Sequence, residues 1–255
     1  MSVTNPLNKA EIDAAAMKAV EDMDISMFST GDVVNMILQR AQIIFDVDRG
    51  GQLIRAWSDG DAQPLVEVAE ARPELLIRRT LAAIYQEFDE TLPTLRAIDP
   101  ERIADIGCGY GFFDVFAARE LGCDIVLIDI EENENRHFGY KMSGSAYSNL
   151  GVAREFALAN GVKKAAVTTI NPKAQDLAAV KPVDLAVSFM SCGFHYPVNT
   201  YMDYFRDGVT ADGHLIIDLR AAREEEQSRT LSEIGKLDIL WAREALVCVH
   251  VKKSG

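Results

Sequence analysis

The chain has 255 residues, of which 26 are Lys or Arg and 39 are Asp or Glu, giving a formal net charge of −13. This acidity argues against a nucleic acid or an anionic membrane surface as partner, because phosphate groups need a basic surface. The length suits one large domain, or one domain with an appendage.

The four cysteines are spread along the sequence and form no Cys-x-x-Cys pair. Neither a zinc site nor a disulfide framework is therefore expected, and we predict no metal. The first residues are too polar for a signal peptide, and no apolar run approaches the ~20 residues that a membrane helix needs. We expect a cytoplasmic protein with reduced thiols and no membrane partner.

Residues 1–99 are predicted to form a helical N-terminal domain. One helix should begin near Ser29 or Thr30, where apolar residues start to recur at 3.6-residue spacing. Another should begin at Pro73, and Pro93 should kink or end it. These helices could form a structural cap, a lid over the substrate, or the surface of a homodimer, and the sequence leaves the choice open.

A strand, a glycine turn and a helix are predicted from residue 102 onward. The apolar strand over 102–106 carries Asp105 and runs into Gly107, Gly109 and Gly111. Glycine lacks a Cβ atom, so the backbone can take positive φ and a ligand can approach it closely. The amino end of the following helix then faces the same crevice, which favours ligand binding there.

A second apolar strand over 124–130 contains Asp129, which lies 22 residues after Gly107. An acidic side chain at this point of a doubly wound fold can accept hydrogen bonds from both hydroxyls of a ribose. The glycine spacing is G-x-G-x-G, whereas a nicotinamide site would show G-x-G-x-x-G. The sequence thus favours a nucleoside-containing ligand other than a nicotinamide dinucleotide.

Strands continue to alternate with helices to the end of the chain, which indicates a mostly parallel sheet with helices on both faces. Asp184, near the start of the fourth strand, is expected to support that strand and not to contact a ligand. The further strands are predicted over residues 165–170, 183–189, 213–219, 237–241 and 245–251.

A polar segment over 131–148 follows the second strand. At the carboxyl edge of the sheet it could close over a ligand, or it could be a solvated loop. Its candidate substrate contacts are His137, Tyr140, Lys141 and Tyr147.

Asp105, the G-x-G-x-G turn and Asp129 together resemble the class I S-adenosylmethionine (SAM)-dependent methyltransferases, over about Arg102 to Lys252. The resemblance implies an α/β, doubly wound fold over residues 100–255, with a seven-stranded, mostly parallel sheet of order 3-2-1-4-5-7-6. Ligands of open α/β sheets bind where the strand order reverses, here between the first and fourth strands.

The resemblance also assigns cofactor contacts. Asp105 and the glycine turn would hold the methionine end of SAM, Asp129 would bind its ribose, and Ile130 would lie against the adenine. The contacting residues of the turn would be Gly107, Cys108, Gly109 and Gly111.

Asn171 follows the third strand, where the family often has an Asp near the adenine. The Asn side-chain amide can do a similar job, and Gln175 and Asp176 are competing candidates. The adenine contact is therefore assigned to Asn171 and Gln175, with Asp176 as the alternative.

The fourth strand leads into residues 188–197, which should face the methyl group of SAM. This segment lacks the Asn/Asp-Pro-Pro-aromatic motif of amide methyltransferases, and is similar to that of bacterial sugar O-methyltransferases. His195 could remove the proton of an acceptor hydroxyl while Tyr196 orients the acceptor. Alternatively, His195 bonds a backbone carbonyl and shapes the pocket. Cys192 is expected to pack in the core, because direct methyl transfer needs no enzyme nucleophile.

The sequence therefore predicts a SAM-dependent methyltransferase of a small molecule, releasing S-adenosylhomocysteine (SAH), with oxygen as the favoured acceptor atom and a sugar hydroxyl as one candidate. N- or S-methylation of a small metabolite in the same fold is the first alternative. A SAM-binding protein without catalysis is the second, and a nicotinamide-dependent oxidoreductase is disfavoured by the glycine spacing.

Overall fold

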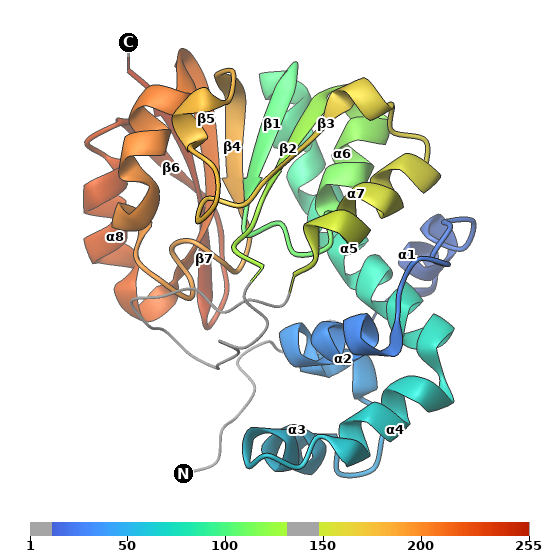
Figure 1. The fold of residues 1–255 in the computed structure, drawn as a ribbon. Helices are drawn as coiled ribbons and strands as arrows, with labels where there is room; N and C mark the ends of the chain where they lie inside the picture. The colour runs from blue at the N-terminus through green and yellow to red at the C-terminus, as the bar shows by residue number, and fades with distance from the viewer. Residues whose placement is uncertain (1–11, 132–147, 255) are drawn as a thin grey trace. The chain divides into compact units, whose positions relative to one another are not determined.

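The computed structural model describes residues 12–131 and 148–254 (Figure 1). They fall into two compact units, which divide between Thr91 and Leu92. The division lies inside one long helix, α5 (Pro73–Ile98), and not at the boundary of residues 99 and 100 that the sequence suggested. Within the described residues, no helix has both the length and the apolar character needed to cross a membrane.

The N-terminal unit is helical, as predicted. Helix α2 begins with Ser29 as its N-cap: the Ser29 hydroxyl accepts the Asp32 N–H, and the Asp32 carboxylate accepts the Ser29 N–H. A bidentate ion pair between Arg40 and Glu87, at 2.6 and 2.7 Å, joins the end of α2 to α5. The elements before α5 are α1 (Ala14–Ala19), α2 (Thr30–Gln39), η1 (Ala41–Ile44), α3 (Gly50–Ser58) and α4 (Gln63–Ala71).

Helix α5 begins at Pro73, as predicted, but it does not end at Pro93. A proline inside a helix removes one backbone hydrogen bond and crowds the preceding turn. The helix nevertheless continues to Ile98, and Leu92 and Leu95 around the proline are buried. Apolar burial here outweighs the cost of the lost hydrogen bond.

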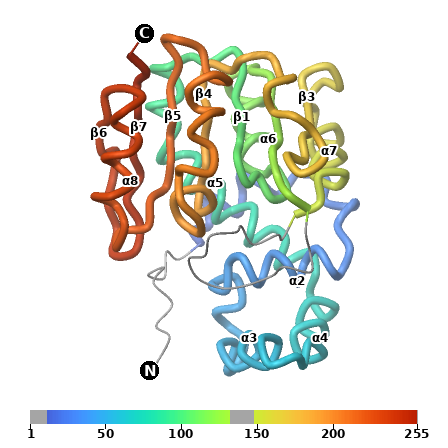
Figure 2. Tube along the Cα trace, turned by 60° about the vertical axis from the view of Figure 1, so that its left-hand side comes forward, coloured from blue at the N-terminus to red at the C-terminus, as the bar shows by residue number. Residues whose placement is uncertain are grey.

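The second unit contains a seven-stranded sheet of order β3-β2-β1-β4-β5-β7-β6, which confirms the predicted order (Figure 2). Strands β1 to β5 pair in parallel, whereas β7 is antiparallel to both β5 and β6. The bounds are β1 (Arg102–Ile106), β2 (Asp124–Ile128), β3 (Val167–Ile170), β4 (Val183–Ser188), β5 (Val209–Arg220), β6 (Gly235–Ala242) and β7 (Leu246–Lys253).

Helices cover both faces of this sheet. Helices α6 (Phe112–Leu121) and α7 (Leu150–Ala159) pack on one face, where a Cβ atom added at Gly111 would meet Leu127 and Ala153. On the other face, β-strand side chains share a core with α8 (Glu224–Leu231) and the short helices η5 (Val198–Tyr201) and η6 (Tyr204–Gly208).

The connection from β3 to β4 differs from the other parallel crossovers. Residues 171–182 contain only one short helical turn, η4 (Leu177–Ala179), where an α-helix is usual between parallel strands. Leu177 and Val180 pack on the core of the α8 face. Near β3 this face is thus covered by residues 171–182, a segment that we call the β3–β4 strap.

Two histidines on neighbouring strands form a direct pair. Nδ1 of His214 lies 2.8 Å from Nε2 of His250, and the rings stack 5.0 Å apart. Burial lowers the pKa of both rings; Lys252 lowers both further, Lys236 lowers that of His250, and Asp238 raises that of His250. The pair is therefore stable as two neutral rings.

We predict that this pair makes folding less favourable at acidic pH. The unfolded chain takes up protons below the ordinary histidine pKa of about 6.5, while the folded pair resists them, so stability should fall as pH is lowered from 7.5 to 5.5. His214→Gln keeps a hydrogen-bonding side chain but cannot titrate, so its urea-unfolding free energy should fall less over this range. If the unfolding free energy changed with pH by the same amount in the variant and in the parent protein, this histidine pair would not be the cause.

Candidate active site

The glycine turn follows β1 at the carboxyl edge of the sheet. Gly107, Gly109 and Gly111 have φ values of 80°, 58° and 68°, a region that side-chain-bearing residues rarely adopt. The N–H groups of Gly107 and Cys108 both donate to the Ile128 carbonyl, at 2.8 and 3.3 Å. The turn is therefore fixed to the end of β2.

The turn also lies against the segment that follows β4. A Cβ atom at Gly107 would lie 1.8 Å from Oγ and 2.4 Å from Cβ of Ser191. The Ser191 hydroxyl in turn lies 3.1 Å from the Tyr196 hydroxyl. The two loops that flank the reversal of strand order are thus in direct contact, and the predicted residue Tyr196 is brought to the glycine turn through Ser191.

Asp129 links the end of β2 to the glycine turn. Its Oδ2 atom accepts the Gly109 N–H at 2.9 Å, and its Oδ1 atom accepts the Ile130 N–H at 2.7 Å. The side chain is buried, which raises its pKa, while the bonds from Gly109 and Ile130 act in the opposite direction. The Ser148 side chain also lowers the pKa of Asp129, and the carboxyl group keeps acceptor capacity for a ligand hydroxyl.

Asp105 faces a second buried acid, Asp114 of α6. Burial and then the neighbouring Asp114 raise the pKa of Asp105 well above its ordinary value, and burial raises the pKa of Asp114 to about 7. Within the described residues, Oδ1 of Asp105 is buried without a hydrogen-bond partner. A cationic group bound beside Asp105 would satisfy this oxygen and favour its ionised form. The sequence reasoning missed Asp114, although an acid among the apolar residues of that helix was a usable signal.

Three predicted adenine-site residues lie together. The Asn171 side-chain N–H donates to the Ile130 carbonyl at 3.3 Å, and the Asn171 backbone N–H donates to Oε1 of Gln175 at 3.0 Å. The Asn171 side-chain oxygen accepts the Lys173 N–H. Asn171 thus holds the ends of β2 and β3 together, whereas the competing candidate Asp176 is exposed and caps η4.

The segment after β4 turns sharply and is anchored to β5. Met190 has a φ of 50°, and its N–H donates to Oδ2 of Asp218. A Cβ atom at Gly193 would lie 2.9 Å from the Asp218 carbonyl oxygen, so only glycine fits. The Gly193 carbonyl accepts the side-chain amide of Gln227 at 2.6 Å. Asp218 and Gln227 are supporting residues that the sequence pattern did not single out.

The two predicted catalytic residues differ in environment. Tyr196 is buried, which raises the pKa of its phenol well above 10 and keeps it neutral. His195 is partly exposed, its backbone N–H donates to the Ser191 carbonyl, and its ring meets the Phe194 ring edge-on. The Arg220 guanidinium stacks on the Phe194 ring at 4.4 Å and so helps to fix this corner.

Cys192 is fully buried, and burial raises the pKa of its thiol. Its N–H donates to the Ser188 hydroxyl, which donates to the Ile106 carbonyl. These contacts agree with the predicted packing role. Asp184 also has the predicted supporting role, because its Oδ2 atom accepts the N–H groups of Glu101 and Arg102.

Some predictions lie beyond the part of the chain that the structure describes. These are the candidate substrate contacts His137, Tyr140, Lys141 and Tyr147 of the 131–148 segment. Among the described residues, no group of three or more His, Cys, Asp or Glu side chains is arranged to hold a metal ion.

No protein-family model and no curated protein matches this chain. Solved structures similar to it include a ribosomal protein L11 methylase from Lactobacillus delbrueckii subsp. bulgaricus, at 18% identity and a TM-score of 0.48, over 65% of this chain and 77% of that one. A magnesium protoporphyrin IX methyltransferase from Synechocystis PCC 6803 with bound SAM shares 19% identity, with a TM-score of 0.47, over 70% and 84%. A putative O-methyltransferase from Klebsiella pneumoniae shares 16%, with a TM-score of 0.46, over 67% and 80%.

The close approach at Gly107 generates a stability prediction. Gly107→Ala should lower the free energy of unfolding by more than ~1 kcal/mol, because it adds both a positive-φ cost and a clash with Ser191. Gly122→Ala is the matched control, since Gly122 has a φ of 74° and no atom within 4 Å of an added Cβ.

Chemical denaturation of both variants measures the difference. Ser191→Gly should recover part of the loss in the Gly107→Ala background, and should recover nothing in the Gly122→Ala background. Equal destabilisation by Gly107→Ala and Gly122→Ala would contradict the contact.

Proposed function

We propose that this protein is a SAM-dependent methyltransferase that acts on a small molecule. The observation that carries the proposal is the pair of buried carboxylates, Asp105 and Asp129, on either side of a positive-φ glycine turn at the reversal of strand order. This edge is where open α/β sheets bind ligands.

The charges of the site suit SAM. The ammonium group of the methionine end would meet Oδ1 of Asp105, which is buried and without a partner among the described residues. The ribose hydroxyls would meet Asp129, and the adenine would lie by Ile130, Asn171 and Gln175. When bound, SAM supplies a methyl group activated by its sulfonium.

We further propose an oxygen acceptor, with His195 and Tyr196 beside it. His195 is partly exposed on the rim that Ser191 joins to the glycine turn, so an acceptor could reach it. The histidine would take the proton of the acceptor hydroxyl, while the neutral Tyr196 phenol would orient the acceptor by a hydrogen bond. A sugar hydroxyl is one candidate acceptor, and N- or S-methylation of a small metabolite is the alternative.

We propose a cytoplasmic location for the protein, in keeping with four cysteines that are all buried and form no disulfide within the described residues. The roles of the N-terminal helices as cap, lid or homodimer surface also remain proposals. A methylated product found by mass spectrometry, after incubation with labelled SAM and a metabolite extract, would identify the acceptor. Binding of SAM without any turnover would instead favour a non-catalytic SAM-binding protein.

The cofactor assignment predicts that Asp129→Ala weakens SAM and SAH binding by about 1–3 kcal/mol, the scale of charge-assisted hydrogen bonds. Asp129→Asn keeps an acceptor for the Gly109 N–H and so separates loss of the charge from loosening of the turn. Calorimetry measures the affinity of each variant for SAM and SAH. Asp124→Ala, at the opposite end of β2, is the control. Unchanged affinity in Asp129→Ala would remove the ribose assignment, and tight NADH binding without SAM binding would overturn the function.

The catalytic assignment predicts that His195→Ala lowers kcat by ~10²–10⁴-fold once the acceptor is known, because a positioned base contributes on that scale. The ionisation of histidine should also disappear from the acidic limb of the pH–rate profile. His195→Gln can form hydrogen bonds but cannot accept the proton at neutral pH, so it should be equally impaired. If His195→Gln retained activity, His195 would be assigned to shaping the pocket. If only the KM for the acceptor changed, His195 would be assigned to binding the acceptor.

A further inference from the structure

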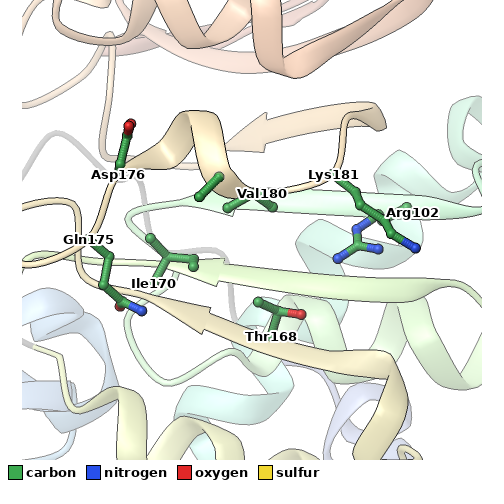
Figure 3. Close-up of a pocket in the computed structure, with 8 residues that line it drawn as sticks. Arg102, Thr168, Ile170, Gln175, Asp176, Val180 and Lys181 are labelled. Atoms are coloured by element: carbon green, nitrogen blue, oxygen red, sulfur yellow. The ribbon is translucent and has the colours of Figure 1, made fainter.

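A hollow lies on the α8 face of the sheet, beneath the strap of residues 171–182 (Figure 3). Its volume is about 570 Å³, within the range of sites for small metabolites. It exists because η4 is a single turn where a full helix would cover β3 and β2. The lining residues are Arg102 from β1, Thr168 and Ile170 from β3, and Gln175, Asp176, Ala179, Val180 and Lys181 from the strap; the one acid among them, Asp176, lies at the end away from Arg102 and Lys181.

Two cationic side chains stand at one end of this hollow, Arg102 and Lys181, as Figure 3 shows. The Arg102 guanidinium forms a long ion pair with Asp124, at 3.9 Å, and Nε of Arg102 is buried without a hydrogen-bond partner in the described residues. Lys181 is exposed and has no ion pair within residues 12–131 and 148–254. Asp184, the nearest acid in sequence, is engaged by two backbone N–H groups.

Tyr204 of η6 adds a second unsatisfied donor near Arg102. Its hydroxyl is buried and has no partner among the described residues. Burial raises the pKa of this phenol to about 12, and the charge of Arg102 acts in the opposite direction. Near Arg102 there are thus two buried donors, its own Nε–H and the Tyr204 O–H, that have no hydrogen-bond acceptor among the described residues.

The remaining lining favours an organic ligand over a bare ion. Thr168 offers a hydroxyl on the same side as Arg102, while Ile170 and Val180 supply apolar wall. A guanidinium fork and an ammonium together match the oxygens of a phosphate or carboxylate. A cationic end on a protein with a net charge of −13 would also attract an anion locally.

We propose that this hollow is a second ligand site, which binds a small organic anion with a phosphate or carboxylate head and a short apolar body. Its cationic end is distant from the glycine turn, because Arg102 opens β1 and Gly107 lies five residues further on, roughly 16 Å along an extended strand. At its other end the hollow is lined by Gln175, which also belongs to the proposed adenine site. The head group lies between Arg102 and Lys181, and the apolar body lies along Ile170 and Val180.

Phenyl phosphate and inorganic phosphate are the probes, with binding measured by calorimetry at low salt. Phenyl phosphate should bind more tightly than inorganic phosphate, because only the former can use the apolar wall. The double variant Arg102→Gln/Lys181→Gln should weaken phenyl phosphate binding at least ~10-fold. The control is Arg206→Gln/Lys236→Gln, which makes the same change in net charge at exposed ion pairs elsewhere.

Lys181→Glu serves as an independent variant, because an exposed side chain can be reversed in charge without disturbing β1. It should abolish phenyl phosphate binding while the thermal melt stays unchanged. Absence of phenyl phosphate binding to the parent protein, or equal weakening in the control, would overturn the proposal. Displacement of phenyl phosphate by SAH would also overturn it, because the hollow would then belong to the cofactor site. These outcomes do not depend on methyl transfer, so the two proposals fail separately.

Discussion

The absence of a side chain at Gly107 is the constraint on which the candidate site depends. Ser191 occupies the space where a Cβ atom would stand, so the loops after β1 and β4 meet directly. Asp129 then ties the same turn to β2 through Gly109. Three neighbouring strands are thereby joined at one edge by contacts of backbone and short side chains. A side chain at Gly107 would force the loops after β1 and β4 apart.

This edge also concentrates acidic groups in a buried setting. Asp105, Asp114 and Asp129 are buried there, and burial is the largest cause of the raised pKa of each. Such carboxyls are costly to ionise without a partner, so they favour a ligand that brings positive charge and hydroxyl donors. The hollow beneath the β3–β4 strap differs in charge, because two cationic side chains, Arg102 and Lys181, lie at one end of it. The second unit therefore presents buried acids at the glycine turn and two cations at one end of the hollow, on the same sheet.

Several features followed directly from the sequence. Apolar runs in the sequence predicted where β1, β2 and β4 lie, because strands that are buried on both faces contain few polar residues. The start of α2 was predicted near Ser29 or Thr30 from the helical spacing of its apolar residues, and the helix begins at Thr30 with Ser29 as its N-cap. The strand order came from the resemblance carried by Asp105, the glycine turn and Asp129, and the observed pairing agrees with it.

Other features were decided only by tertiary structure. Helix α5 continues past Pro93 because burial of the neighbouring residues outweighs the tendency of proline to end a helix. Helix α4 forms around two buried residues, Leu65 and Ala69, that no strong sequence pattern marks. The contact of Ser191 with Gly107 joins residues 84 positions apart, and no periodicity encodes it. The hollow likewise exists because of a helix that is missing from one crossover. The sequence determined which residues could bind a ligand, because residue type sets chemistry; the fold decided which of them meet, because long-range packing sets distance.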